Sequence, residues 1–105
     1  MNISEHQAWL TDFYKERDWY KLSPFIRLNF LTEEVGEVSQ SIRDMEIGRD
    51  HPGEAKHTLE YRQNHLHEEL GDALDQVLIL ASKYDIDAQD LLDASERKLK
   101  KRFNL

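Results

Sequence analysis

Apolar side chains recur at intervals of three and four residues along most of this 105-residue sequence. The repeat runs without interruption between residues 28 and 45 and returns between residues 66 and 84. Such spacing places apolar groups on one face of an α-helix, and no stretch shows the alternation of a β-strand. Only two prolines and four glycines interrupt the chain. The sequence therefore predicts an all-α fold in a single domain, residues 1–105.

Local signals predict where a first helix begins. Ser4, with Gln7 three residues later, has the form of a capping box. A helix starting there would run to about Arg17. Its apolar side is expected to contain Trp9, Leu10, Phe13 and Tyr14.

Two longer helices are expected in the middle of the chain. Ser23 followed by Pro24 indicates the start of the second helix, which should end near Gly48. A loop follows, and the third helix should begin between residues 54 and 58. Each of these helices has an apolar stripe, the row of apolar residues on the face expected to be buried. In the second helix the stripe is Leu28, Leu31, Val35, Val38, Ile42 and Met45. In the third helix it is Leu66, Leu70, Ala73, Leu74, Val77, Leu80, Ala81 and Tyr84.

A fourth helix closes the predicted fold. Asp87 is expected to cap it, and Asp90 lies in the first turn, where an acidic side chain is favourable. The residues expected to face inward are Leu91, Leu92, Ala94, Leu99 and Phe103.

Composition narrows the class of protein. The net charge of −7 argues against nucleic-acid binding through a basic surface, although five basic residues cluster between positions 97 and 102. There is no cysteine, no signal-like start and no run of ~18 apolar residues. We expect a soluble cytoplasmic protein with no membrane or nucleic-acid partner. A chain of this length buries only roughly 60–70 % of its unfolded surface, so oligomerisation is an expected source of additional core.

One acidic octapeptide occurs twice, as LTEEVGEV over residues 31–38 and as LHEELGDA over residues 66–73. Among the three acidic residues of each copy, two that are three positions apart lie on the same flank of their helix's apolar stripe. These residues are Glu34 and Glu37 in the first copy, and Glu69 and Asp72 in the second. The midpoint between the two pairs falls at Gly53 in the loop. A helical hairpin turning there would bring all four carboxylates to one level.

The carboxylates in such a groove would repel each other, at on the order of 3 kcal/mol for a pair ~5 Å apart in an effective dielectric of ~20. They are either spread apart and solvated, as a Glu-x-x-Glu pair on a helix usually is, or they hold a cation. Oxygen ligands favour magnesium, manganese or calcium. Asp75, one turn beyond Asp72, is either an additional ligand or an exposed acid. Gly36 and Gly71 cost up to ~1 kcal/mol in helix interiors, so we expect a close approach of helices there.

The order of these motifs resembles the MazG-type all-α nucleoside triphosphate pyrophosphohydrolases. RDWYKLSPFIRLNFLTEEVGEV resembles that family's aromatic and proline-containing lead into its first acidic helix. EELGDALDQVLILASKYDIDAQDLL is similar to its second acidic helix and the turn that follows, and KLKKRF resembles its basic C-terminal signature. Two features depart from the family pattern. The interval between the acidic pairs is longer than is common, and Ser95, Glu96 and Leu99 stand where an asparagine is often found near a lysine.

The resemblance implies that Glu34, Glu37, Glu69 and Asp72 coordinate magnesium, with manganese able to substitute. The implied reaction cleaves a nucleoside triphosphate between its α and β phosphates to a monophosphate and pyrophosphate, as housecleaning of standard or damaged nucleotides. The resemblance also favours a homodimer or a dimer of dimers, in which a central antiparallel helix pair completes a four-helix bundle. Two alternatives stay open: a relative acting on phosphoribosyl-ATP, and a non-catalytic helical oligomer that binds a structural cation or a protein partner.

Three residues are the main candidates for substrate binding. Lys98 and Arg102 lie one turn apart and could contact phosphates, although cations near a helix C-terminus also gain ~0.3–1 kcal/mol from the helix dipole. Trp19 could stack on a nucleobase, whereas aromatic residues at helical spacing usually belong to a core or an interface. Arg27 and Asn29 are either polar substrate contacts or, more commonly for such residues, surface groups.

Four of the five histidines follow one another in and after the predicted loop. They are His51, His57, His65 and His67. A transition-metal site is one reading of this cluster, but loop histidines are usually solvated.

Overall fold

The computed structural model describes residues 1–48 and 52–105. Over these ranges the chain forms four α-helices and no strand: α1 Ile3–Glu16, α2 Pro24–Ile47, α3 Leu59–Ser82 and α4 Ala88–Arg102. The prediction of four helices in an all-α fold is therefore confirmed. None of the helices in the described part of the chain is long and apolar enough to cross a membrane.

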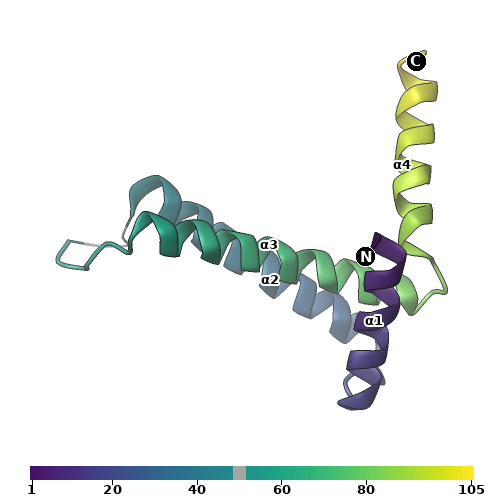
Figure 1. Cartoon of the computed structure of the whole chain (residues 1–105), viewed down its shortest axis with the longest axis horizontal. Helices are drawn as coiled ribbons and strands as arrows, with labels where there is room; N and C mark the ends of the chain where they lie inside the picture. The colour runs from purple at the N-terminus through teal and green to yellow at the C-terminus, as the bar shows by residue number, and fades with distance from the viewer. Residues whose placement is uncertain (49–51) are drawn as a thin grey trace.

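The two long helices, α2 and α3, lie side by side along most of their length (Figure 1). The predicted boundaries are confirmed. The Ser23 hydroxyl accepts a hydrogen bond from the Ile26 amide, and Pro24 occupies the first turn. Gly48 ends α2 with φ 77°, a left-handed conformation that glycine adopts at low cost. Thr58 caps α3 through its side chain, at the end of the predicted range.

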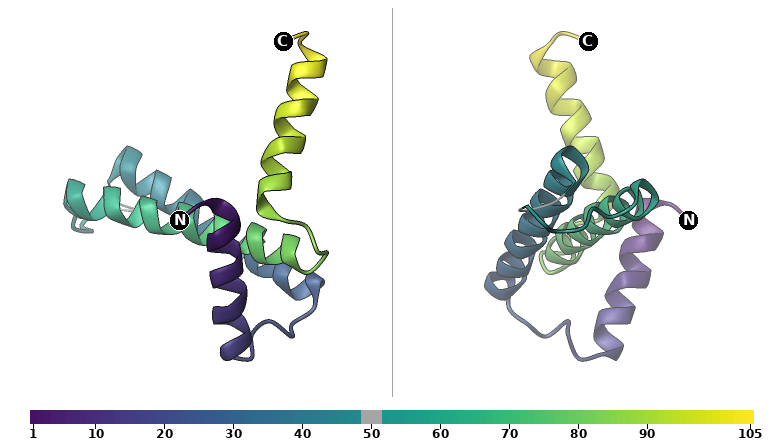
Figure 2. Two further views of the ribbon diagram at one scale, coloured as in Figure 1. Left: turned by 45° about the vertical axis from the view of Figure 1, so that its right-hand side comes forward. Right: turned by 90° about the vertical axis from the view of Figure 1, so that its left-hand side faces the viewer.

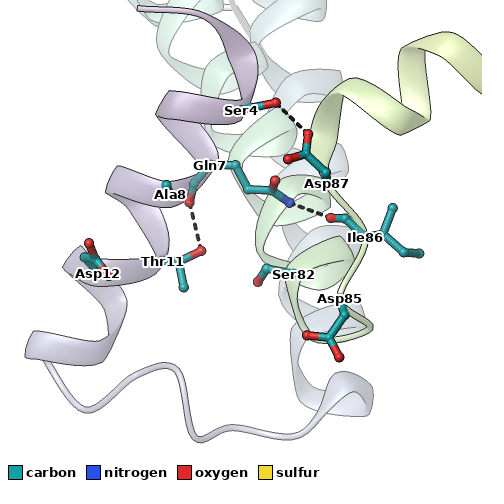
Figure 3. Close-up of a pocket in the computed structure, with 9 residues that line it drawn as sticks. All are labelled: Ser4, Gln7, Ala8, Thr11, Asp12, Ser82, Asp85, Ile86 and Asp87. Carbon is teal, nitrogen blue, oxygen red and sulfur yellow. Dashed lines mark hydrogen bonds between the residues drawn. The ribbon is translucent and has the colours of Figure 1, made fainter.

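The predicted capping box of α1 is wrong. Asn2 is the N-cap, and it forms the box with Glu5. Ser4 instead donates its hydroxyl to Asp87 at 2.5 Å, and Gln7 is buried (Figure 3). The Gln7 amide bonds three backbone groups across the fold, which the sequence pattern could not reveal because they lie more than seventy residues away. These bonds run from Gln7 Nε2 to the Leu78 and Ile86 carbonyls and from the Ala88 amide to Gln7 Oε1.

A small core forms where α1 crosses the C-terminal part of α3 and the start of α4. Its buried members are Leu10, Tyr14, Leu78, Ile79 and Ala88. Leu78 and Ile79 are the most deeply buried large side chains, yet they lie outside the predicted stripe. The stripe describes one apolar face, whereas α3 packs against α2 on one side and α1 on another. Trp9, expected in the core with Leu10, is exposed instead.

Helix α4 projects away from the α2–α3 pair (Figure 2). Its predicted inward residues are therefore largely exposed in the single chain, with Leu92 at 44 % and Phe103 at 64 %. The α2 and α3 stripes are also only half covered, because Leu28, Val35, Ile42, Leu70, Leu74 and Val77 are exposed. The radius of gyration is 17.1 Å, against about 13 Å for a compact chain of this length. One chain thus leaves broad apolar faces without a covering element.

Candidate metal centre

Three glutamates meet between α2 and α3. Each of Glu34, Glu37 and Glu69 offers an oxygen that lies within 4.8 Å of the others' oxygens. Glu34 and Glu37 are one turn apart on α2, so their side chains share one flank of that helix. Glu69 reaches the same place from α3. Among the residues that the structure describes, this is the one group that could hold a metal ion.

Two of the three carboxylates, those of Glu34 and Glu69, are partly withdrawn from water, whereas Glu37 is exposed. Burial, followed by the charge of Glu37, raises the pKa of Glu34 to about 7. Burial and a hydrogen bond with Glu37 likewise raise the pKa of Glu69. One oxygen of each, Glu34 Oε2 and Glu69 Oε2, is buried without a hydrogen-bond partner. Unpaired buried carboxylate oxygens are costly, and a hard divalent cation is a suitable partner because it prefers oxygen ligands. The donor set therefore fits such an ion.

Asp72 lies outside this group of three and is exposed. Its position on α3 is farther from the apolar stripe than that of Glu69, which explains its exposure. It still belongs to the same electrostatic environment, because its charge contributes to the raised pKa of Glu34. Its own pKa is raised by burial and then by Asp75.

Asp75, expected to be either an additional metal ligand or an exposed acid, is paired with a histidine in the structure. Its carboxylate lies 2.8 Å from His6 Nε2, which ties α3 to α1. The expectation about Gly36 and Gly71 is wrong for the single chain. A Cβ atom at either position would have no neighbour within 4 Å, so neither marks a close approach of α2 to α3.

Sequence reasoning missed the role of His65 at this centre. Its Nε2 lies 3.5 Å from Glu69 Oε1, one turn away on α3, and its charge partly offsets the rise in the pKa of Glu69. The i,i+4 spacing could have revealed the pair. His57 pairs with Asp44 at 3.0 Å, while His51 lies outside the described residues. His6, His57 and His65 thus each lie beside a carboxylate, His67 is exposed, and no group in the described part of the chain that could hold a metal ion contains a histidine.

The substrate candidates lie in two places. Trp19 is half-exposed and packs edge-on against Phe13 and Tyr14, beside a cavity of about 240 Å³. Lys98 and Arg102 are exposed on the projecting part of α4, so a single chain does not bring them beside the glutamates (Figure 1).

The two polar residues near the start of α2 differ from each other. Asn29 is exposed, as a surface residue would be. Arg27 is only 4 % exposed, so its interpretation as a surface group is wrong.

Comparison with known proteins identifies the family. Residues 25–104 match the family model for the MazG nucleotide pyrophosphohydrolase domain, which covers all three clustered glutamates and Asp72. The chain is also similar to the uncharacterized protein YvdC of Bacillus subtilis (strain 168). The two are 39 % identical over 103 residues, or 98 % of this chain and 97 % of the relative. The matched domain spans most of the sequence and contains the acidic centre, and the chain therefore belongs to the MazG nucleotide pyrophosphohydrolase family.

Proposed function

We propose that this protein is a magnesium-dependent nucleoside triphosphate pyrophosphohydrolase. The substrate would be cleaved between the α and β phosphates, giving a nucleoside monophosphate and pyrophosphate. The observation that carries the proposal is the cluster of Glu34, Glu37 and Glu69, with two buried oxygens that lack partners. The family match supports the reaction class.

In this proposal the three glutamates hold the cation, and Asp72, one turn from Glu69, is the fourth protein ligand. A bound magnesium ion would neutralise phosphate charge and lower the pKa of an attacking water. The chain's own contribution is to supply anionic oxygens in a partly buried position. Glu34 must give up its proton for this, because its pKa without a cation is about 7. Manganese, another cation with a preference for oxygen ligands, could substitute.

We propose that the active form is a homodimer or a dimer of dimers. The exposed apolar residues of α2 and α3, which include Val35, Ile42 and Leu74, would pack against a second copy. The antiparallel α2–α3 pairs of two chains would then form a four-helix bundle, a common arrangement for a ligand site between facing helices. Covering these faces would also supply the core that one extended chain lacks.

Two different segments of the protein would bind the base and the phosphates of the substrate. Trp19 would stack on the nucleobase, since its ring is half-exposed beside a cavity. The basic α4 of one chain would reach the acidic centre of its partner, where Lys98 and Arg102 would contact the phosphates. This arrangement explains why α4 projects away from its own chain's α2–α3 pair (Figure 2). It would also provide positive charge beside the substrate in a protein of net charge −7.

A panel of standard and damaged nucleoside triphosphates, incubated with magnesium and assayed separately for pyrophosphate and orthophosphate, tests the proposal. We expect pyrophosphate and the matching monophosphate, and no activity when a chelator is added. Orthophosphate release would refute the assigned bond. Phosphoribosyl-ATP should be included, because cleavage of that compound alone would assign the protein to the related activity. Release from none of these compounds would favour a non-catalytic oligomer.

A further inference from the structure

A second feature lies along the same two helices as the glutamates. A cavity of about 240 Å³ is lined by Trp19, Leu22, Arg27, Phe30 and Gln76. Pockets for whole drug-sized ligands are usually ~300–1,000 Å³, so this cavity suits a smaller group. Two aromatic side chains in its lining favour a flat ring.

The cavity is in register with the metal centre. Arg27 precedes Glu34 by seven residues on α2, and Gln76 follows Glu69 by seven residues on α3. Seven residues make almost two turns, so each pair shares one helix face and is separated by about 10 Å along the axis. A nucleotide with its phosphates at the glutamates would extend its base toward this cavity.

Arg27 is a buried cation without an anionic partner. Its Nη2 donates to the Trp19 carbonyl at 3.2 Å, and its guanidinium lies about 5 Å from the ring centres of Tyr14 and Phe30. No carboxylate in the described part of the chain pairs with it, and its Nε has no hydrogen-bond partner. Its charge, after burial, lowers the pKa of Lys83. A buried charge in this condition is destabilising unless something else accepts its remaining hydrogen bond.

The other polar group of the cavity is already engaged. Gln76 Oε1 accepts from Arg27 Nη1 at 3.4 Å, and Gln76 Nε2 donates to the Tyr14 hydroxyl at 3.1 Å. Arg27 fixes this orientation of the amide, because a guanidinium only donates hydrogen bonds. The unused hydrogen-bonding capacity of these two side chains is therefore mostly donor capacity, because Arg27 keeps three of its five N–H groups and Gln76 keeps one of its two.

We propose that Arg27 determines the base specificity of the site by donating to a ring carbonyl of the nucleobase. Arginine typically binds the carbonyl edge of guanine, whereas a free glutamine amide would bind the amino edge of adenine. With Gln76 engaged, the cavity favours bases that present a carbonyl group at C6 of a purine or C4 of a pyrimidine, namely guanine, hypoxanthine, uracil and thymine. It disfavours adenine and cytosine, because their amino groups at C6 and C4 would face a buried cation. This inference rests on the proposed function, because it assumes that the site takes a nucleotide.

The test compares binding of paired triphosphate analogues that carry a methylene group between the α and β phosphates and so resist cleavage. Titration calorimetry in magnesium would compare the guanosine analogue with the adenosine analogue, and the uridine analogue with the cytidine analogue. We expect the guanosine and uridine analogues to bind about 10-fold or more tightly than the adenosine and cytidine analogues, as for a hydrogen bond to a charged group. Equal affinities within both pairs, or a preference for the amino bases, would overturn the inference.

Two variants assign the preference to Arg27. Arg27→Met keeps an unbranched apolar stem but removes the charge and the donors, and it should abolish the preference. If that variant does not fold, Gln76→Glu gives Arg27 a carboxylate partner and should weaken binding of the carbonyl bases. Arg97→Met, the same change on exposed α4, is the matched control and should retain the preference. Survival of the preference in a folded Arg27→Met or Gln76→Glu protein would contradict the role of Arg27.

The outcomes separate this inference from the proposed function. Pyrophosphate release without a base preference would refute the inference and leave the function intact. Selective binding of carbonyl bases without pyrophosphate release from the matching triphosphates would support the inference and refute the hydrolysis.

Discussion

Glu34 on α2 and Glu69 on α3 meet at one centre although thirty-five residues separate them in the sequence, and each has one buried oxygen without a hydrogen-bond partner. Both carboxyl groups have a raised pKa, with burial as the first cause. The fold therefore maintains a costly arrangement of charge at the place where the family match predicts its chemistry. Five predictions rest on this arrangement and on the faces that surround it.

Replacement of Glu37 should remove activity without unfolding the protein. Glu37 interacts electrostatically with both other glutamates, so Glu37→Gln keeps the shape of the side chain but removes a negative ligand. We expect pyrophosphate release to fall by at least about 100-fold, as for loss of one stabilising group at a reaction centre. Far-UV circular dichroism should be unchanged. Glu33→Gln, an exposed neighbour on α2, is the matched control and should retain activity.

The stability of the metal-free protein should fall as pH rises between about 4.5 and 7. The folded pKa of Glu34 is raised from 4.5 to about 7. The folded state therefore holds this proton more tightly than the unfolded state does, and it loses that advantage on deprotonation. Thermal melts in a chelator should show a declining Tm across this window, and Glu34→Gln should flatten the decline.

Above pH 7, magnesium should raise the stability of the folded protein, whereas deprotonation of Glu34 in the metal-free protein lowers it. A cation that binds the folded carboxylates stabilises the folded state by mass action, and its binding competes with the proton on Glu34. We expect a larger Tm increase on adding magnesium at pH 8 than at pH 5.5. An increase of the same size at both pH values would contradict the assignment of Glu34 as a ligand.

The exposed apolar face of α2 should be an interface between copies of the chain. Ile42 is 46 % exposed, and Ile42→Lys would bury a charge if a second copy covers it. Size exclusion with light scattering should show a dimer or larger species for the wild type and a shift toward monomer for the variant. Ser39→Lys, at an exposed polar position of the same helix, should have little effect. A wild type that is only monomeric would contradict the interface.

Lys98 and Arg102 should act on the partner's acidic centre. The double variant Lys98→Ala, Arg102→Ala should raise KM, because phosphate contacts would be lost. Mixing it with Glu37→Gln after partial unfolding and refolding should restore part of the activity, since a mixed dimer would contain one site with all groups intact. No recovery on mixing would place these basic residues at their own chain's site or outside the mechanism. Lys100→Ala with Lys101→Ala provides the control on the same helix.

The sequence predicts most of the helix boundaries in this fold because their signals are local. Ser23 with Pro24 begins α2, Gly48 ends it, and Asp87 caps α4, as expected. Ser4 also has the residue type of an N-cap, but Asn2 forms the cap and Ser4 bonds Asp87 instead. A local pattern cannot distinguish the two roles when the competing partner lies far along the chain.

The candidate site is predicted less completely. Repeated spacing places Glu34, Glu37 and Glu69 together, because helical geometry alone determines which flank they share. The exposure of Asp72 and the burial of Arg27 depend instead on how far α3 is rotated and on where α1 packs. The burial of Leu78 and Ile79 has the same origin, since α1 covers a side of α3 that one apolar stripe does not describe.

The side chain of Gln7 has a wider consequence than its size suggests. By bonding Leu78, Ile86 and Ala88 at once, it joins the end of α3 to the first residue of α4 and so sets the direction in which α4 leaves the molecule. A substitution there would leave every acidic ligand in place, yet it would misdirect the arm that we expect to cross between subunits. A substitution of Gln7 would therefore reduce activity at the distant acidic centre by changing the angle between α3 and α4.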